Sequence, residues 1–292
     1  MDFDRQYENY VNLIEGAIDQ QIQEWTARIE DPTLLKAMSY SLTAGGKRIR
    51  PVLVLATCSA LGGDVQKALP YALAIEQVHT YSLIHDDLPA MDNDDFRRGK
   101  PSNHKVFGEA MAILAGDALL NAAYENAICH IDGESCKKAA GILADSAGYY
   151  GMVSGQATDM TTDVKTKSAD LLATIHSLKT GKLLTASVLI GGAIAGANCD
   201  SALTSFGESF GRLFQITDDV LDVVGNKNSL GKSTGKDQEQ NKLTAVSLWG
   251  LEAAQNVAKE EYEKAVESIA FLGDNGAFLA ELARRVFVRI FA

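Results

Sequence analysis

The sequence of 292 residues is poor in cysteine, and the few it has exclude the sites that paired cysteines build. None of them forms a CxxC pair, so neither a zinc ribbon nor a thioredoxin-type redox site is indicated. They stand among alanine and leucine, and we therefore expect reduced, buried thiols and a cytoplasmic protein. The four residues are Cys58, Cys129, Cys136 and Cys199.

Positive charge is also in short supply. The chain has 27 lysines and arginines against 38 aspartates and glutamates, a formal net charge of -11 and a pI of about 4.9. A protein with a net negative charge is a poor nonspecific binder of nucleic acid. Its surplus carboxylates are available instead as ligands for metal ions.

Long apolar runs are missing as well. The most apolar stretch, LLTASVLIGGAIAGANC from Leu183 to Cys199, is shorter than the roughly 20 residues of a membrane span and rich in small side chains. It predicts a buried core helix and no membrane span. The N-terminal MDFDRQYENY lacks the basic and apolar regions of a signal peptide, so none is expected.

Five prolines, no linker and no internal repeat favour one uninterrupted unit. Apolar residues recur at intervals of three and four, as in Tyr7, Tyr10, Ile14 and Ile18, which is the spacing of an amphipathic helix. We predict a single all-α domain over 1–292 with about ten helices. Besides the first helix, we expect helices over 51–61, 70–87, 108–129, 139–156, 168–191, 201–224, 243–269 and 277–292.

An acidic cluster, SLIHDDLPAMDNDDFRRGKP, follows the helix expected over 70–87. It contains five aspartates, among them Asp86, Asp87 and Asp92. Carboxylates crowded at one helix end repel each other unless water or a shared cation separates them. Mg²⁺ prefers oxygen ligands and is usually held by one or two carboxylates together with substrate phosphates. A solvated acidic loop is an equally good interpretation of this cluster alone.

A second acidic cluster, FQITDDVLDVVG, shifts the balance towards a metal site. Asp218 and Asp222 are four residues apart and share one helix face, with Asp219 between them and Gln215 three residues before. Two such clusters on apolar helices predict two walls of one metal-lined site.

Basic residues accompany both clusters. Lys and Arg together suit a diphosphate, because Arg makes forked contacts and Lys supplies a mobile charge. The candidates are Lys47, Arg50, Arg97, Arg98, Lys179, Lys182, Lys232, Lys236 and Lys242. GNKNSLGKST is rejected as a phosphate-binding P-loop, because its glycine spacing is wrong and no strand precedes it. GGAIAG is likewise rejected as a dinucleotide loop, because it lies inside a small-residue helix.

The order of these segments resembles the trans-prenyltransferases, the polyprenyl diphosphate synthases, and within them the bacterial short-chain type. The resemblance covers nearly the whole chain through GGKRIRP, DDLPAMDND, RRGKP, LAGDALL, GQATDM, KTGKL, QITDDVLD and GKSTGKD. It implies an isoprenoid-synthase helical bundle around a deep apolar cavity. It also implies head-to-tail condensation of isopentenyl diphosphate with an allylic diphosphate, and a homodimer.

The resemblance assigns roles to individual residues. Asp86, Asp87 and Asp92 would hold two Mg²⁺ ions, and Asp218, with Asp219 and Asp222, a third. The allylic diphosphate would meet Arg97, Lys179, Lys232 and Lys242. Isopentenyl diphosphate would meet Lys47, Arg50, His79 and Arg98. Asn226 stands where related bacterial enzymes usually carry Asp, a departure that touches none of these residues.

The chemistry agrees with this assignment. Ionisation of a C–O bond leaves an allylic cation and a diphosphate anion, and Mg²⁺ with lysines such as Lys179 stabilises the anion. Thr180 and Gln215 can direct oxygen dipoles at the cation, and apolar walls exclude water. The released diphosphate is the expected proton acceptor. His85 is expected to orient the first acidic cluster rather than to act as a base.

Tyr81 and Ser82 lie one turn or more before Asp86, roughly 7.5 Å along a helix in the case of Tyr81. In the family an aromatic residue five positions before the first aspartate accompanies short products. The C15 product farnesyl diphosphate is therefore expected, with a geranyl or geranylgeranyl diphosphate synthase as the alternative. A metal-dependent phosphohydrolase and an inactive regulatory subunit are remote alternatives, because both acidic clusters are intact.

Overall fold

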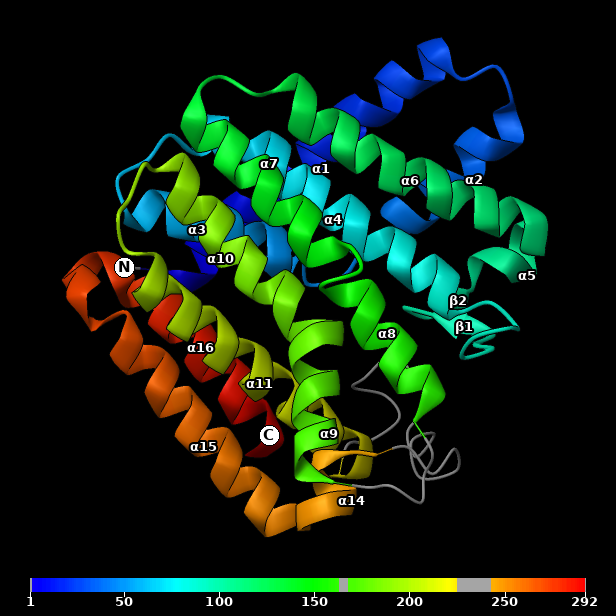
Figure 1. Cartoon of the computed structure of the whole chain (residues 1–292). Helices are drawn as coiled ribbons and strands as arrows, with labels where there is room; N and C mark the ends of the chain where they lie inside the picture. Colours follow the sequence, from blue (N-terminus) through cyan, green and yellow to red (C-terminus); the bar gives the residue numbers. More distant parts are fainter. Residues whose placement is uncertain (1, 163–167, 225–242, 292) are drawn as a thin grey trace.

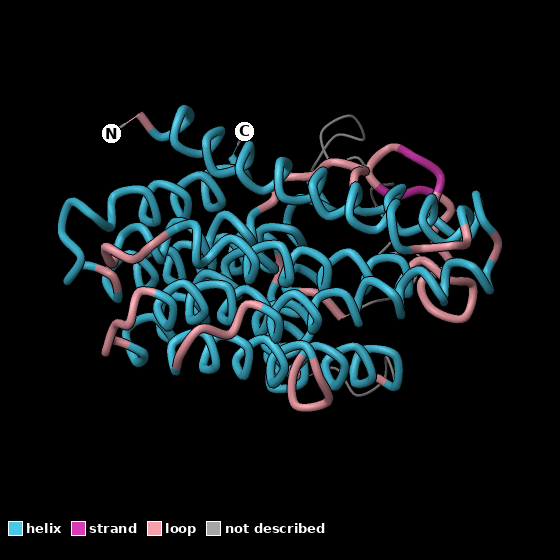
Figure 2. The backbone as a smooth tube through the Cα atoms, turned by 90° about the horizontal axis from the view of Figure 1, so that it is seen from above, coloured by secondary structure: helices cyan, strands magenta, loops and turns pink. Residues whose placement is uncertain are grey.

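The computed structural model describes residues 2–162, 168–224 and 243–291. These residues are almost entirely helical, as expected (Figure 2). Among them the strands are confined to one antiparallel hairpin, in which β1 (Phe96–Arg97) pairs with β2 (Lys100–Pro101). The sequence did not predict this hairpin, because two-residue strands leave no periodic pattern.

The first four helices are α1 (Phe3–Arg28), α2 (Pro32–Leu42), α3 (Ile49–Ala60) and α4 (Val65–Asp86). Three of them begin after an aspartate whose side chain accepts a backbone N–H of the first turn. These N-caps are Asp2, Asp31 and Asp64. Helix α4 starts earlier than expected, because Pro70 lies inside it rather than at its first turn.

The middle of the chain contains α5 (Asn103–Phe107), α6 (Glu109–Cys129), α7 (Glu134–Ala147) and α8 (Met152–Thr161). The single helix expected over 139–156 is wrong, because α7 and α8 are separate. At Gly151 the chain turns so tightly that a Cβ atom would lie 2.1 Å from the carbonyl oxygen of Ser146. Apolar spacing alone could not reveal that break.

Helix α9 (Ala169–Ile175) continues through a π-helix, η2 (His176–Gly181), into α10 (Lys182–Ile194). Helix α11 (Asp200–Val224) follows. The helix expected over 243–269 is divided at Gly250, whose φ of 82° ends α14 (Ala245–Trp249) before α15 (Leu251–Ser268). The remaining segments are η3 (Ala270–Gly276), α16 (Ala277–Val288) and η4 (Arg289–Phe291).

Helix α10 lies at the centre of the bundle and packs against α3, α4, α7 and α11 (Figure 1). The approach to α3 is close, since a Cβ atom on Gly191 would lie 2.5 Å from the carbonyl oxygen of Val54. This confirms the core helix predicted from Leu183 onward. Within the described residues, no helix has both the length and the apolar character needed to cross a membrane.

Buried apolar side chains from α1 through α16 form one continuous cluster. Of the cysteines, all free, Cys58 and Cys136 are buried and Cys199 is half-buried. The expectation of burial is wrong for Cys129, which ends α6 with its side chain exposed.

Candidate active site

One cavity of about 1390 Å³ opens between α4, α8, η2, α11 and the segment 46–50. It is lined by all the predicted site residues that the structure describes except Asp87 and Lys182, the latter being the first residue of α10. These are Lys47, Arg50, His79, Tyr81, Ser82, Asp86, Asp92, Arg97, Arg98, Lys179, Thr180, Gln215, Asp218, Asp219 and Asp222. Asp87 instead lines a small neighbouring pocket. Lys232, Lys236, Lys242 and Asn226 lie outside the described residues.

The first acidic cluster is formed where α4 ends and the chain folds back on itself. Asp86 is the last residue of α4, and its carbonyl oxygen accepts the backbone N–H of Asp92 at 2.8 Å. Burial, and then the neighbouring Asp92 and Asp87, raise the pKa of Asp86 to about 6, although Lys179 and Arg97 oppose this rise. A carboxylate in this position is favourable for a cation to bind.

Asp87 is 2% exposed, and its carboxylate accepts hydrogen bonds from the guanidinium of Arg97. The Arg97 Nε atom lies 2.9 Å from Asp87 Oδ1, and Nη2 of the same guanidinium also contacts that oxygen. Burial lowers the pKa of Arg97, but hydrogen bonding to Asp87 outweighs it and the net shift is upward. The carboxylate of Asp87, which the resemblance predicts as a Mg²⁺ ligand, thus holds Arg97 at the cavity wall.

The second acidic cluster lies on α11 and combines three different environments. Asp218 forms an ion pair of 3.4 Å with Arg289 of η4. Asp219 is buried and accepts hydrogen bonds from protein donors. The Oδ2 atom of Asp222 is buried and has no hydrogen-bond partner among the described residues. The spacing of four residues therefore does place Asp218 and Asp222 on one cavity-lining face.

The π-helix η2 carries Lys179 and Thr180 into the cavity, and two glycines allow it to approach its neighbours. A Cβ atom on Gly155 of α8 would lie 2.2 Å from the backbone nitrogen of Lys179. On the other side, a Cβ atom on Gly211 of α11 would lie 2.8 Å from Gly181. Segments of π-helix are rare and occur often at functional sites.

Lys179 joins the two sides of the cavity. Its Nζ atom lies 2.6 Å from Asp159 of α8. Burial lowers the pKa of Lys179, but Asp159 and Asp86 together outweigh it and raise the pKa above its ordinary value. The ammonium is therefore charged at neutral pH, on the wall of the cavity that both acidic clusters line.

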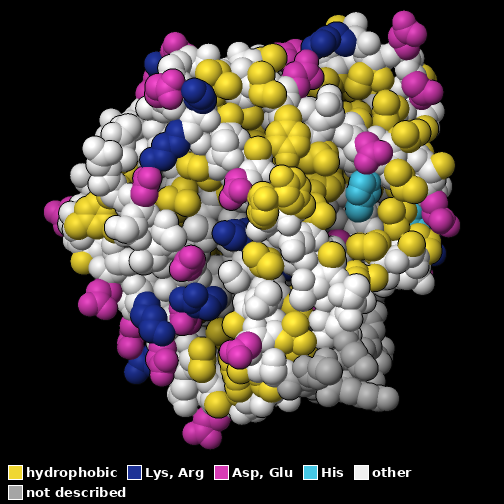
Figure 3. All heavy atoms as spheres, in the orientation of Figure 1, with side chains coloured by type: hydrophobic (Ala, Val, Ile, Leu, Met, Phe, Trp, Pro, Cys, Tyr) yellow, Lys and Arg dark blue, Asp and Glu magenta, His cyan; other side chains and the backbone are white. Residues whose placement is uncertain are grey.

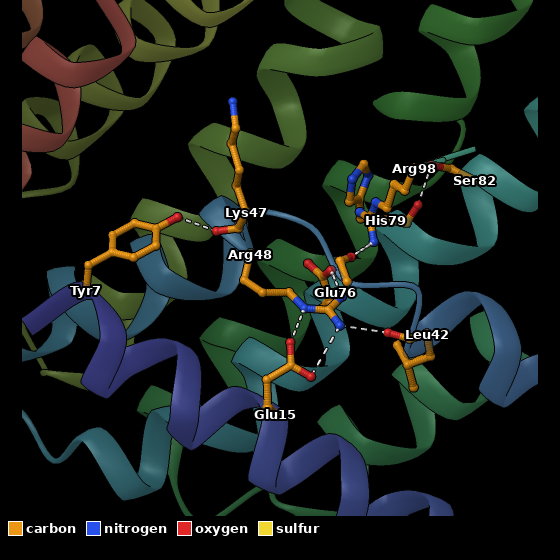
Figure 4. A network of polar contacts seen from close by, with 10 residues as sticks. Tyr7, Glu15, Leu42, Lys47, Arg48, Glu76, His79, Ser82 and Arg98 are labelled. Carbon is orange, nitrogen blue, oxygen red and sulfur yellow. Dashed lines mark hydrogen bonds and ion pairs between the residues drawn. The ribbon is translucent and has the colours of Figure 1, made fainter. Parts of the chain in front are cut away.

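A buried charge network supports the segment GGKRIRP (Figure 4). Arg48 has a left-handed backbone with φ 49° and a side chain that donates to Glu76 at 2.6 Å, Glu15 at 2.8 Å and the Leu42 carbonyl oxygen at 2.8 Å. Lys47 points the opposite way from Arg48. An Arg with positive φ is strained and persists only when surrounding contacts hold it.

The cations presented by this segment are partly stripped of water. Desolvation, and then the nearby Arg289, lower the pKa of Lys47, although Asp218 opposes the shift. Desolvation lowers the pKa of Arg50 to about 10. The Nε atom of Arg50 is buried without a hydrogen-bond partner among the described residues. Desolvated donors of this kind favour an anionic ligand.

Tyr81 is 6% exposed, lines the cavity and meets His85 edge-on with ring centroids 5.7 Å apart. The His85 Nε2 atom lies 3.1 Å from the carbonyl oxygen of Ile113 on α6. The Ser82 hydroxyl donates to the carbonyl oxygen of His79 at 2.9 Å. The ring of Tyr81 therefore packs against His85, whose own ring contacts α6, and forms part of the cavity wall.

Sequence reasoning gave no role to four residues that the structure brings to this cavity. Asp159 and Gln156 were visible in GQATDM, yet nothing in that segment named their partners. The amide of Gln156 is buried without a hydrogen-bond partner among the described residues. Arg289 and His176 face Asp218 and Asp219 across elements distant in sequence. Only the presence of a basic C-terminal segment could have hinted at Arg289.

The donor set fits Mg²⁺. Within the described ranges, no three His, Cys, Asp or Glu side chains are grouped so that they could hold a metal ion by themselves. Mg²⁺ does not need such a cage, because substrate phosphates and water complete its coordination. Carboxylates at two sides of one cavity, with the Asp222 Oδ2 atom lacking a partner among the described residues, meet that requirement.

Comparison with known proteins finds relatives that match nearly the whole chain. The chain is 47% identical over 290 residues to a farnesyl diphosphate synthase from Geobacillus stearothermophilus, covering 97% of each. It is 44% identical over 260 residues to a geranylgeranyl diphosphate synthase from Cyanophora paradoxa, covering 87% of each. The crystal structure of a geranyltransferase from Legionella pneumophila superimposes with a TM-score of 0.88 at 33% identity. That match covers 99% of this chain and 97% of the other.

The sequence model described as polyprenyl synthetase matches residues 31–271, which include both acidic clusters and the π-helix between them. The relatives share this chain's length and the structural neighbour shares its helical bundle. The resemblance noted from the sequence is thereby confirmed, and the chain belongs to the polyprenyl synthetase family.

Proposed function

We propose that this chain is a farnesyl diphosphate synthase, which condenses isopentenyl diphosphate with dimethylallyl diphosphate and then with geranyl diphosphate. The observation that carries the proposal is that residues of both acidic clusters, two sets of cations and Tyr81 line one and the same cavity. The names of relatives that match nearly the full chain support it.

The two diphosphates would occupy different sets of cations. Lys179 and Arg97 lie beside the acidic clusters and suit the allylic diphosphate, together with the predicted Lys232 and Lys242. Lys47, Arg50, His79 and Arg98 suit isopentenyl diphosphate. Partial desolvation of Lys47 and Arg50 supports this, since a phosphate would restore the interactions that burial removed.

Asp86, Asp92, Asp218 and Asp222 would hold Mg²⁺, with Asp87 and Asp219 less available because protein donors already contact them. When bound, Mg²⁺ ions, of which the family resemblance implies three, neutralise the diphosphate and favour its departure. Lys179 adds a positive charge to the same leaving group.

The reaction breaks the C1–O bond of the allylic substrate, and the electron pair leaves with the diphosphate. The double bond of isopentenyl diphosphate supplies the electrons for the new carbon–carbon bond to C1. The resulting cation loses a proton, which the released diphosphate accepts, and a new double bond forms. Oxygen atoms of Thr180 and Gln215 stabilise the cation, while the apolar wall around Tyr81 excludes water.

We also propose that residues 1–292 are one domain and that two copies form a homodimer. The continuous apolar core supports the single domain. Large apolar side chains are exposed on α6 and around the start of α8, and Figure 3 shows apolar side chains gathered on that side. A face of this kind favours a protein partner. Its members are Ile113, Leu114, Tyr149, Tyr150 and Val153.

The proposal is tested by incubating purified protein with Mg²⁺, isopentenyl diphosphate and dimethylallyl diphosphate, and measuring the chain length of the dephosphorylated products. We expect a C15 alcohol. A C20 alcohol would favour the geranylgeranyl diphosphate synthase alternative, which the relative from Cyanophora paradoxa supports. A C10 alcohol would favour a geranyl diphosphate synthase. No product with or without Mg²⁺ would contradict the synthase function itself.

A further inference from the structure

The carboxylate of Asp219 receives donors from three different elements. It is 4% exposed. On its own helix, Gln215 Nε2 donates to Oδ1 at 3.0 Å. The backbone N–H of Ala245, at the start of α14, donates to Oδ2 at 2.7 Å, and His176 Nε2 of η2 lies 3.4 Å from the same oxygen. Both carboxylate oxygens are therefore engaged by the protein.

This arrangement determines the direction of the Gln215 amide. A carboxylate that accepts at both oxygens can receive only the NH₂ group of Gln215, so the amide oxygen must point the other way. That oxygen, Oε1, accepts the hydroxyl proton of Thr180 at 2.8 Å. The hydroxyl proton is thereby used, and only lone pairs of the Thr180 oxygen remain for the cavity.

Both Thr180 and Gln215 line the cavity beside Lys179. With the amide in this direction, the atoms that face a developing cation are oxygens carrying partial negative charge. A reversed amide would direct its NH₂ group at Thr180 and free the hydroxyl proton towards the cavity. Dipoles fixed in advance stabilise a developing charge, whereas reversed ones oppose it.

We propose that Asp219 is a positioning residue rather than a metal ligand: it orients the Gln215 amide, and through it the Thr180 hydroxyl, towards the site of carbocation formation. The inference rests on the proposed function, because it assumes that a cation forms beside Thr180. The inference gives Asp219 and Asp222 different roles, because the Oδ2 atom of Asp222 has no hydrogen-bond partner among the described residues.

The test is Asp219→Asn in the full-length protein. The N–H of Ala245 can only donate, so the new amide turns its oxygen to Ala245 and its NH₂ group to Gln215. Gln215 must then reverse. We expect kcat to fall about 100-fold, the effect of losing one oriented dipole, while KM for both substrates changes little.

Binding of Mg²⁺ with inorganic pyrophosphate, measured by calorimetry, gives a readout independent of turnover. We expect its Kd in Asp219→Asn to stay within about twofold of wild type, because the substitution removes no proposed metal ligand. The matched control is Asp200→Asn, at the exposed start of the same helix, where the side chain pairs with Lys138 at 2.5 Å. It should leave kcat and Kd unchanged.

The double variant Gln215→Glu/Asp219→Asn keeps the total charge. It also restores the hydrogen bond in which the Thr180 hydroxyl donates to residue 215. The new carboxylate at position 215 accepts both from the new amide at position 219 and from Thr180. We therefore expect kcat at least about tenfold above that of Asp219→Asn. Circular dichroism and the thermal midpoint establish that each variant is folded.

Three results would overturn the inference. They are an unchanged kcat in Asp219→Asn, a Kd for Mg²⁺ and pyrophosphate weakened more than about tenfold, and a double variant no faster than the single one. A wild-type protein that forms no prenyl product would overturn the proposed function together with this inference. An active wild type with an unaffected Asp219→Asn overturns the inference alone.

Discussion

The ammonium of Lys179 on η2 lies 2.6 Å from the carboxylate of Asp159 on α8, where Gly155 lets the two elements meet. The ion pair holds the charged amine of Lys179 at the cavity wall. The spacing of residues within η2 does not predict this contact, because its partner lies on another helix. The contact depends on an inter-helix distance that only glycine permits, which makes it open to a direct test.

Gly155→Ala should separate α8 from η2. The new methyl group would lie 2.2 Å from the backbone nitrogen of Lys179, which cannot move aside like a side chain. We expect the free energy of unfolding to fall by about 1–3 kcal/mol and product formation to slow. Gly141→Ala on α7, where no atom lies within 4 Å, is the matched control and should not destabilise the protein. Equal behaviour of the two variants in urea unfolding would contradict the prediction.

Arg48→Met should leave the carboxylate of Glu76, which is 1% exposed, without its ion-pair partner. Removing one member of a buried ion pair costs about 3–5 kcal/mol. We also expect KM for isopentenyl diphosphate to rise, because the backbone that presents Lys47 and Arg50 loses its anchor. Chemical denaturation measures the first effect and initial rates the second.

The double variant Arg48→Met/Glu76→Gln removes the stranded charge along with its partner. It should recover a large part of the lost stability. A single Arg48→Met variant as stable as the wild type would mean that the network contributes nothing.

Tyr81→Ala should lengthen the product beyond C15, because it opens the cavity wall where the ring now packs against His85. Chromatography of dephosphorylated products measures the distribution. Tyr81→Phe keeps the ring and loses only the hydroxyl, so its product should remain C15. An identical distribution from the alanine variant and the wild type would remove Tyr81 as the residue that limits chain length.

Acid should weaken the contact between α1 and α16. Hydrogen bonds from Arg284 and then Arg285, opposed by slight burial, lower the pKa of Glu281 from 4.5 to about 2. A lowered folded-state pKa gives stability that is fully present above the unfolded-state pKa and is lost as pH falls towards the folded-state value. Arg285 extends the network to Asp4 of α1 at 2.6 Å.

The stability difference between wild type and Glu281→Gln should therefore be constant from neutral pH to about 5 and shrink as pH falls through the window between 4.5 and about 2. Urea unfolding at several pH values measures it. The pairs are largely exposed, so about 1 M NaCl should reduce the difference at neutral pH. A difference that grows in acid would contradict the assignment.

Leu114→Glu should weaken the proposed dimer. Leu114 is 53% exposed on α6, among the other apolar side chains of that face. We expect sedimentation at micromolar concentration to shift towards the monomer. Phe271→Glu on η3, where the ring is 54% exposed away from α6, is the control and should leave the mass unchanged. A monomeric wild type would contradict the proposed assembly.

Much of the fold followed from local pattern. Apolar residues at intervals of three and four predicted α1, α3, α6 and α11, because a helix face repeats on that period whatever surrounds it. The helices predicted as continuous over 139–156 and 243–269 were divided. Breaks at Gly151 and Gly250 depend on tight turns and positive φ, which hydrophobic spacing does not record.

The candidate site likewise has a part that the sequence predicted and a part that depends on the tertiary structure. The sequence by itself predicted one metal-lined site between two acidic clusters, Asp86, Asp87 and Asp92 in the first and Asp218, Asp219 and Asp222 in the second, because crowded carboxylates repel each other unless water or a cation separates them. Only the tertiary structure decided which partner each one meets: Arg97 for Asp87, and Gln215, His176 and Ala245 for Asp219. Sequence spacing describes one helix at a time, whereas these contacts depend on how closely separate helices pack.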